Sequence, residues 1–279
     1  MSRHQSVQEA VRAAAGELAA AGVPSPRFDA EELAAFSLGV ERRDLWRAPA
    51  VGPEFVSYVR RRVAREPLQH ITGRAHFRHL TLAVGPGVFV PRPETEVVVD
   101  AVLSAALGTS RPVVVDLGTG SGAIALAVAD ELPGARVHAV EADPAAHAWA
   151  GRNSAGTAVD LRLGDMADAF PDLDGEVDVV VSNPPYIPVG AVVRDPEVAT
   201  HDPALALWSG ADGLDAVRVV ERVAARLLRP GGTVVVEHAD LQGESAPAVF
   251  AATGRWTGVA DHRDLADRDR YLTARRAAG

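Results

Sequence analysis

Apolar residues recur with two different periods along the chain. Up to about residue 68 they stand three and four apart, as in VQEAVRAAAGELAAAGV and RFDAEELAAFSLGV, which predicts amphipathic helices. Gly22 followed by Pro24 ends the first helix, and Asp29 is the expected N-cap of the second. We therefore predict a small helical domain over residues 1–68.

The pattern changes after residue 68. LQHITGRAHFRHLTLAVGPGVFV alternates and is punctuated by glycine, which predicts a β-hairpin linker over residues 69–90. Beyond it, short apolar runs alternate with helical patterns, and this order favours a doubly wound α/β domain over residues 91–279, with a mainly parallel sheet covered on both faces. The expected strands are 113–117, 137–141, 159–163, 177–182 and 233–238.

Composition narrows the class of protein. The 279 residues are 47% hydrophobic, enough for a substantial core, and include no cysteine, which excludes disulfides and cysteine nucleophiles. The N-terminus lacks the apolar core of a signal peptide, and no stretch approaches the roughly 20 apolar residues that span a bilayer. We expect a cytoplasmic protein that does not contact a membrane.

Charge is distributed unevenly. Residues 1–90 carry a balance of +3 and residues 91–279 a balance of −12, and all 28 basic residues are arginine. The acidic part is poorly suited to a phosphate backbone, so we expect no direct nucleic-acid binding. Four arginines form a dense basic cluster that is either a solvated helix face or a docking surface for a partner: Arg60, Arg61, Arg62 and Arg65.

A glycine-rich turn, DLGTGSG, follows the first predicted strand of the sheet and precedes a helix. Its glycines allow a tight turn and a close approach to a ligand, and Glu141, at the end of the next strand, can accept hydrogen bonds from ribose hydroxyls. The spacing is compatible with S-adenosylmethionine, which we favour, with a nicotinamide dinucleotide, or with a packing turn alone. The cofactor-binding candidates in the turn are Asp116, Gly118, Thr119, Gly120, Ser121 and Gly122.

Asp165 and Met166 follow the third predicted strand. At this position Asp165 could accept a hydrogen bond from the adenine amino group and Met166 could cover the adenine ring. The alternatives are a helix N-cap for Asp165 and a core position for Met166.

SNPPYI, residues 182–187, ends the fourth predicted strand abruptly, because proline has no N–H to continue a ladder. The strand lies beside the first, so the motif faces DLGTGSG across the crevice where open α/β sheets bind ligands. The Asn183 carbonyl and the rigid backbone carbonyls of Pro184 and Pro185 offer acceptors, and Tyr186 offers an aromatic wall. We predict a slot for a planar NH2 group, with Asn183, Pro184 and Tyr186 as the catalytic residues and Asn183 also touching the cofactor. No metal is expected.

Six blocks of sequence resemble, in order, those of the HemK family of protein-(glutamine-N5) methyltransferases. They are EPLQHITGRAHF, VFVPRPETE, DLGTGSGAIALA, VSNPPYI, HDPALAL with GADGL, and LRPGGTVVVEH. The resemblance implies a class I methyltransferase domain with a seven-stranded sheet, an N-terminal substrate-recognition domain and S-adenosylmethionine as cofactor, left as S-adenosylhomocysteine. It also implies methylation of the glutamine in the Gly-Gly-Gln motif of peptide chain release factors. The chain departs from the family pattern at Glu141, Met166, His70, His238 and Ala239.

The resemblance also gives the PRPETE segment a place in the site. It implies that Phe89 and residues 91–96, with Glu94 among them, line the substrate pocket beside Asn183, Pro184, Pro185 and Tyr186. A simpler reading of the segment is a helix N-terminus, and Arg92 could hold a cofactor carboxylate or pair with Glu94. Alternative functions are glutamine methylation of a ribosomal protein, amino-methylation of nucleic acid, or a cofactor-binding module without catalysis.

Overall fold

The computed structural model describes residues 6–193 and 195–278, which form two compact units. Within that range the helical unit holds residues up to Arg74 together with 193–201, and the catalytic unit holds 75–192 and the residues from Asp202 onward. The predicted division differs in two places. The β-hairpin groups with the catalytic unit, and a nine-residue segment from inside the predicted catalytic domain groups with the helical one.

The helical unit is built on short amphipathic helices, as the sequence predicts. Its first helix is capped by Ser6, whose side chain and backbone exchange hydrogen bonds with Glu9. Apolar residues of the helices form one core that includes Leu18, Leu33 and Leu45. The elements are α1 (Val7–Ala20), α2 (Pro26–Leu38), the 3-10 helix η1 (Arg42–Arg47), α3 (Phe55–Val63), α4 (Leu68–Thr72) and α8 (Pro196–His201).

Asp29 does not cap α2, contrary to the sequence-based expectation. The helix begins earlier, at Pro26, a residue favoured in a first turn, and Asp29 lies inside it and is buried. Its carboxylate accepts a hydrogen bond of 2.7 Å from Arg62 Nε. Burial raises the pKa of Asp29, and the neighbouring Arg62 opposes that rise.

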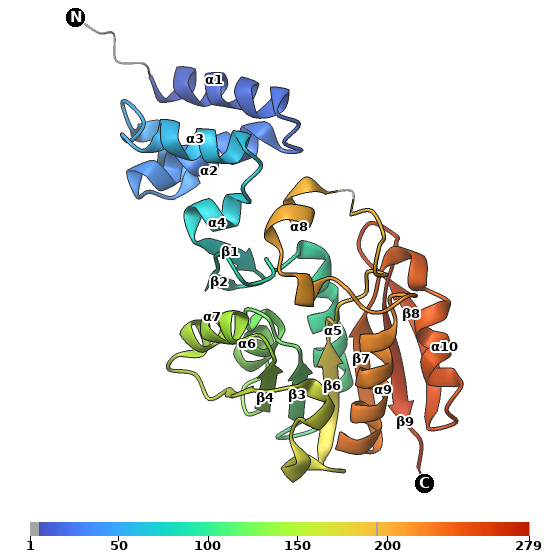
Figure 1. The fold of residues 1–279 in the computed structure, drawn as a ribbon. Helices are drawn as coiled ribbons and strands as arrows, with labels where there is room; N and C mark the ends of the chain where they lie inside the picture. Colours follow the sequence, from blue (N-terminus) through green and yellow to red (C-terminus); the bar gives the residue numbers. More distant parts are fainter. Residues whose placement is uncertain (1–5, 194, 279) are drawn as a thin grey trace, which may run out of the picture. The chain divides into compact units, whose positions relative to one another are not determined.

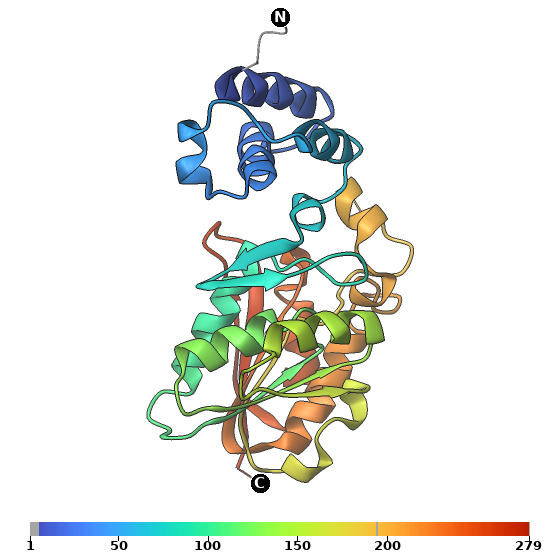
Figure 2. The same cartoon turned by 90° about the vertical axis from the view of Figure 1, so that its left-hand side faces the viewer.

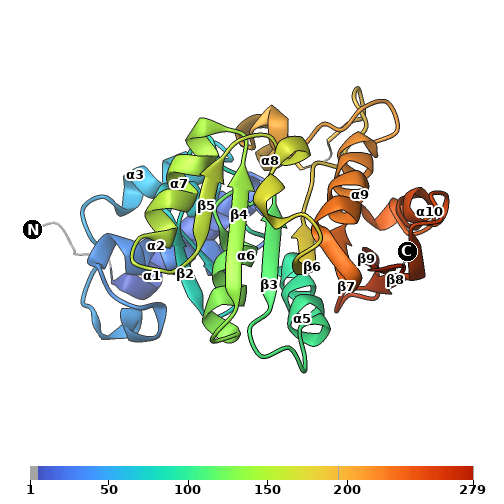
Figure 3. The same cartoon turned by 90° about the horizontal axis from the view of Figure 1, so that it is seen from below.

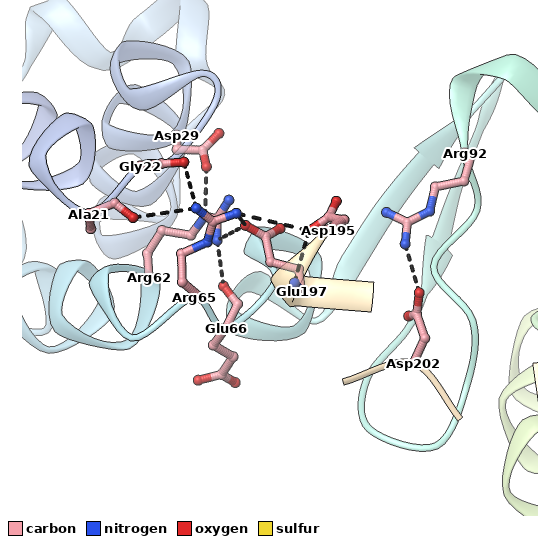
Figure 4. A network of polar contacts seen from close by, with 10 residues as sticks. All are labelled: Ala21, Gly22, Asp29, Arg62, Arg65, Glu66, Arg92, Asp195, Glu197 and Asp202. Atoms are coloured by element: carbon pink, nitrogen blue, oxygen red, sulfur yellow. Dashed lines mark hydrogen bonds and ion pairs between the residues drawn. The ribbon is translucent and has the colours of Figure 1, made fainter. Parts of the chain in front are cut away.

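Arg62 and Arg65 are engaged inside the helical unit (Figure 4). Arg62 Nη1 lies 2.7 Å from a Glu197 carboxylate oxygen, and Arg65 Nη2 lies 2.9 Å from the same oxygen. Arg65 also donates to the Gly22 carbonyl. The segment that carries α8 is thus fastened to the helices by charge.

The basic cluster is therefore largely structural. Arg61 pairs with Glu66 at 2.5 Å, and Arg62 is buried, whereas Arg60 is exposed. Neither sequence-based reading, a solvated face or a docking surface, describes Arg62, because its guanidinium is used to neutralise two carboxylates within the unit.

The catalytic unit contains a seven-stranded sheet in the order β5-β4-β3-β6-β7-β9-β8 (Figures 1 and 3). β9 runs antiparallel to its neighbours and the remaining neighbouring pairs are parallel, which confirms the predicted mainly parallel sheet. The strands are β3 (Val113–Leu117), β4 (Arg136–Glu141), β5 (Asp160–Leu163), β6 (Val177–Ser182), β7 (Leu228–Glu237), β8 (Trp256–Arg263) and β9 (Asp269–Arg276).

Helices cover both faces of this sheet, and two separate apolar cores result. One face packs on α5 and α6, with α7 beside α6; the other packs on α9 and α10. The helices are α5 (Glu96–Ala105), α6 (Ala123–Glu131), α7 (Pro144–Ser154), α9 (Asp215–Leu227) and α10 (Ser245–Ala251). The 3-10 turns are η2 (Pro93–Thr95), η3 (Met166–Asp168), η4 (Pro171–Leu173), η5 (Ala204–Ala206) and η6 (Asp240–Gln242).

The predicted hairpin is shorter than residues 69–90. It consists of β1 (Arg74–Phe77) and β2 (Leu80–Ala83), and α4 precedes it. Figure 2 shows the hairpin beside α7, where the Asn153 side chain exchanges two hydrogen bonds with the Ala83 backbone.

Chain order reverses between β3 and β6. From β3 the chain adds β4 and β5 on one side, and β6 and β7 follow on the other. The carboxyl ends of β3 and β6 therefore flank a crevice of the kind where open α/β sheets bind ligands. The two sequence motifs singled out above stand at these two strand ends. No helix among the described residues is long and apolar enough to cross a membrane.

Candidate active site

The SNPPYI motif leaves the sheet directly after β6, as predicted. Ser182, the last residue of the strand, donates 2.7 Å to the Leu117 carbonyl and so joins the ends of β6 and β3. Beyond it, Pro184 is buried, and Asn183 and Tyr186 are half-buried. The two motifs that the sequence placed across one crevice are therefore in direct contact.

The backbone carbonyl of Tyr186 is fixed by contacts with Gln242 and Gly213. Its carbonyl accepts a 3.2 Å hydrogen bond from Gln242 Nε2, and Gly213 passes close enough that a Cβ there would lie 2.4 Å from the same oxygen. Burial raises the pKa of the Tyr186 phenol, with Glu237 adding to the rise, so the ring stays neutral. A fixed loop and a neutral ring suit an aromatic wall.

The glycine-rich turn connects β3 to α6 in a strained path that glycine allows. Gly118, Gly120 and Gly122 all have positive φ, and an added Cβ at Gly118 or Gly120 would meet no atom within 4 Å. The turn thus presents backbone to open space at the carboxyl end of the sheet. Thr119 and Ser121 are both buried.

The Asp116 carboxylate is hydrogen-bonded to the glycine-rich turn and to the helix that follows it. One carboxylate oxygen accepts hydrogen bonds from Thr119 Oγ1 at 2.6 Å and from the Ala125 N–H at 3.2 Å. The other oxygen, Oδ1, is buried and lacks a hydrogen-bond partner within the described chain. Burial raises the pKa of Asp116 to about 7. An unpartnered buried oxygen beside an open turn fits a site that a polar ligand completes.

Glu141 ends β4 and is buried against the same turn. One of its oxygens accepts from the Gly120 N–H at 2.8 Å and the other from the Asp143 N–H at 2.9 Å. A carboxylate oxygen can accept more than one hydrogen bond, so these contacts leave capacity for ribose hydroxyls. The sequence did not predict these two hydrogen bonds, by which Glu141 fixes the backbone at Gly120 and Asp143.

Asp165 and Met166 lie at the end of β5. Asp165 Oδ1 caps η3 by accepting from the Ala167 N–H at 2.8 Å, and Met166 packs partly against the core. The N-cap alternative is therefore observed for Asp165, whereas Met166 is only half-buried at the edge of the core. Their contacts with adenine remain a prediction.

Arg92 pairs with Asp202 and not with Glu94, which the sequence offered as its partner (Figure 4). The two side chains are 2.8 Å apart, the Asp202 side chain is buried, and the Arg92 guanidinium lies 4.9 Å from the centre of the Phe89 ring. Glu94 is exposed at the start of η2. The PRPETE segment is thus both a helix start and a neighbour of the predicted pocket.

Comparison with known proteins identifies the family of this chain. Residues 9–73 match the family described as the PrmC N-terminal domain, and residues 80–196 match the methyltransferase small domain. A release factor glutamine methyltransferase of Streptomyces coelicolor is 58% identical over 96% of this chain and 97% of its own length. One of Mycolicibacterium smegmatis is 49% identical over 98% of each chain. The chain belongs to the release factor glutamine methyltransferase family. The resemblance inferred from the six sequence blocks is confirmed.

Family membership does not come with a single substrate. A relative from Streptomyces pristinaespiralis is 47% identical over 90% of this chain and 89% of its own length, and it is a 4-amino-L-phenylalanine/4-methylamino-L-phenylalanine methyltransferase. Both kinds of named substrate carry an NH2 or NH group on a planar system. The slot predicted at Asn183 suits that shared chemistry.

Solved structures confirm the fold of the catalytic unit. The rRNA methyltransferase RsmC of Thermus thermophilus, in complex with AdoMet and guanosine, covers 73% of this chain and 49% of its own at 23% identity, with a TM-score of 0.52. A methyltransferase of Pyrococcus furiosus covers 72% of this chain and 90% of its own at 18% identity, with a TM-score of 0.50. The catalytic unit therefore has the class I S-adenosylmethionine-dependent methyltransferase fold.

Several residues near the slot were missed from the sequence, or were given no individual role there. Thr95 accepts a 3.3 Å hydrogen bond from Asn183 Nδ2, and Gln242 holds the Tyr186 carbonyl. Asp202 neutralises Arg92, and Glu237 lies fully buried at the end of β7. The sequence contains one indication of Glu237, because this acid comes near the end of the apolar run TVVVEH. That run lies in β7, which pairs with β6, the strand directly before Asn183.

Proposed function

We propose that this chain transfers the methyl group of S-adenosylmethionine to the side-chain amide nitrogen of the glutamine in the Gly-Gly-Gln motif of peptide chain release factors. The observation that carries the proposal is the position of Asn183–Tyr186 at the end of β6, joined to the glycine-rich turn of β3. The 58% identity with a release factor glutamine methyltransferase over nearly the full length supports the substrate.

The residues of the turn fit a nucleoside cofactor. Open space in front of Gly118 and Gly120, and the unpartnered Asp116 Oδ1 behind them, fit a ligand with polar edges. Glu141 would hold the ribose hydroxyls, Asp165 and Met166 would contact the adenine, and Thr119, Ser121 and Gly122 would contribute to the cradle around the cofactor. When bound, S-adenosylmethionine supplies an electrophilic methyl group.

Asn183 and its neighbours would prepare the glutamine amide. An amide nitrogen is a poor nucleophile because its lone pair is delocalised into the carbonyl. Asn183 Oδ1 and a proline carbonyl would each accept one N–H, which favours a localised pair, and the Tyr186 ring would fix the plane. The nitrogen then forms its bond to the methyl carbon, the sulfur–carbon bond breaks, and the nitrogen loses a proton. Positioning and hydrogen bonding account for the rate under this scheme.

The helical unit and the PRPETE segment are consistent with the proposed methylation of a release factor. The helical unit would recognise the release factor, and the PRPETE segment with Phe89 would line the pocket. The acidic balance of residues 91–279 argues against nucleic acid as substrate. Absence of any apolar stretch of spanning length in the sequence supports a cytoplasmic place of action, where release factors act.

Methyl labelling tests the proposal. Purified protein with labelled S-adenosylmethionine should label a release factor, and should leave unlabelled a release factor whose Gly-Gly-Gln glutamine is replaced by alanine. Equal labelling of both would reject the assigned glutamine. Free 4-amino-L-phenylalanine, the substrate of the 47% identical relative, belongs in the same assay. Turnover of it in place of the release factor would move the assignment to small aromatic amines.

Glu141→Ala is expected to weaken S-adenosylmethionine binding by about 1–3 kcal/mol, because it removes a buried acceptor that faces the ribose and the Gly120 N–H. Calorimetric titration of the cofactor measures the change. Asp130→Ala, an exposed acid at the end of α6, is the matched control and should bind normally. Unchanged affinity in Glu141→Ala would reject the ribose role.

A further inference from the structure

A buried carboxyl group that the proposed function does not use lies beside the slot. Glu237 is the last residue of β7 and is 1% exposed. Its Oε2 atom is buried and accepts no hydrogen bond from any described residue. A buried carboxyl is costly unless its neighbours compensate for lost hydration, so its presence at a strand end beside the site calls for a physical reason.

Strand register explains why Glu237 and Asn183 meet. In the parallel pairing of β6 with β7, Ser182 stands opposite Val236. Asn183 and Glu237 each follow those paired residues, and side chains alternate between faces along a strand. The two side chains therefore leave the same face of the sheet at neighbouring strand ends.

Thr95, at the end of η2, completes a group of three side chains from three elements. Asn183 Nδ2 lies 3.3 Å from Thr95 Oγ1, and both side chains lie near enough to the Glu237 carboxyl that hydrogen bonding from them acts to lower its pKa. Thr95 is itself 4% exposed. Thr95 and Glu237 are thus nearly closed to water, and in such surroundings each donor must face an acceptor.

A carboxylate can only accept hydrogen bonds. The end of the Asn183 amide that faces Glu237 must then be its NH2 group, and Thr95, whose single hydroxyl proton goes to the carboxylate, must accept from the same NH2 group. Asn183 Oδ1 is left pointing away from the cluster. A reversed amide would aim its NH2 group at the substrate NH2 group, donor against donor.

We propose that Glu237 is a positioning residue, whose carboxylate acts with the Thr95 hydroxyl to hold the NH2 end of Asn183 and so to present Oδ1 to the substrate amide. The proposal rests on the proposed function for the identity of that amide. It gives the last residue of β7 and the threonine of PRPETE a defined part in the reaction.

Charges around the cluster support this role. Burial raises the pKa of Glu237 to about 7, whereas Thr95, Arg270 and Asn183 act to lower it and Glu94 adds to the rise. Tyr186 also faces the group. Once protonated, the carboxyl can donate, and it no longer dictates which end of Asn183 faces it. Turnover should therefore fall as pH drops through about 7.

Three variants test the proposal with a release factor as substrate. Glu237→Gln and Thr95→Val should each lower kcat at least about tenfold while the cofactor Kd stays within about twofold; Thr95→Ser, which keeps the hydroxyl, should stay near wild type. The double variant should be little worse than the poorer single one, as expected for residues acting through one shared contact. The acid limb of the pH profile should disappear in Glu237→Gln.

Glu221→Gln is the matched control. Glu221 is 2% exposed and accepts hydrogen bonds from Trp256 and Arg255 elsewhere in the catalytic unit. Its replacement should lower stability and spare kcat. If it lowers kcat as much as Glu237→Gln does, the effect is general destabilisation and the proposal fails.

The orientation of Asn183 can also be read without turnover. In ¹⁵N-labelled protein, the side-chain amide signals that disappear in Asn183→Ala belong to Asn183, and they should shift in both Glu237→Gln and Thr95→Val. Unshifted signals would overturn the proposal even if no release factor is methylated. Full kcat in both variants alongside an inactive Asn183→Ala would overturn it while leaving the proposed function intact.

Discussion

Replacing Asn183 with alanine is expected to lower methyl transfer by about 10²-fold or more while leaving S-adenosylmethionine affinity nearly unchanged. Loss of a single preorganised hydrogen-bonding group at a reacting centre commonly has an effect of this size. Asn183 stands at the end of β6 with its NH2 group bound to Thr95, so its carbonyl oxygen is the group available to the substrate amide. Single-turnover methyl transfer measures the first quantity and calorimetry the second.

Val189→Ala serves as the control for Asn183→Ala. Val189 follows the same motif and is 65% exposed, so its truncation should change neither turnover nor cofactor binding. Turnover at the wild-type rate in Asn183→Ala would remove the amide slot from the mechanism. A large loss of cofactor affinity in that variant would instead show that the residue serves mainly the cofactor.

Arg62→Ala is expected to destabilise the helical unit by about 3–5 kcal/mol, the usual cost of removing one partner from a buried ion pair. The Arg62 side chain is 4% exposed and contacts the carboxylates of Asp29 and Glu197, whose side chains are 8% and 15% exposed. Without it, two poorly hydrated carboxylates remain close together. Amide hydrogen exchange in α1, α2 and α3 measures the loss of protection.

Arg60→Ala is the control that distinguishes the loss of a buried ion pair from the mere loss of a positive charge. Arg60 lies in the same helix but is exposed, and its removal should change the free energy of unfolding by no more than about 0.5 kcal/mol. Equal protection in the Arg62→Ala and wild-type proteins would show that the Arg62 ion pairs contribute nothing net to stability.

Most of the fold follows from patterns that act over short distances. The period of the apolar residues predicts α1 and α2 of the helical unit and five strands of the sheet, because burial of one helix face or of a whole strand is visible in a short stretch of sequence. β8 and β9 were not identified, since WTGVADHR and DRYLTARR are only partly buried and lack a continuous apolar run. The segment 193–201 was assigned to the other domain because Glu197 pairs with Arg62 and Arg65, which are far away in sequence.

The site was predictable to the extent that its residues stand in motifs. Asn183 and Gly118 follow strand ends, where chain direction alone brings them together. The partners of those residues were harder to find. The sequence offered the nearby Glu94 as an ion-pair partner of Arg92, whereas the observed partner, Asp202, is 110 residues away. Glu237 reaches Asn183 only through the register of β6 and β7, which a single sequence does not specify.

The chain passes between its two units three times, at residues 74–75, 192–193 and 201–202. No single cut can therefore yield two complete pieces. A fragment that begins at residue 75 keeps Glu197 and loses Arg62 and Arg65, and a fragment that ends at residue 74 keeps both arginines and loses Glu197. The same constraint applies to recombination between relatives. An exchanged helical unit keeps the Arg62 and Arg65 pairs with Glu197 only when the gene segments for residues 1–74 and 193–201 are exchanged together.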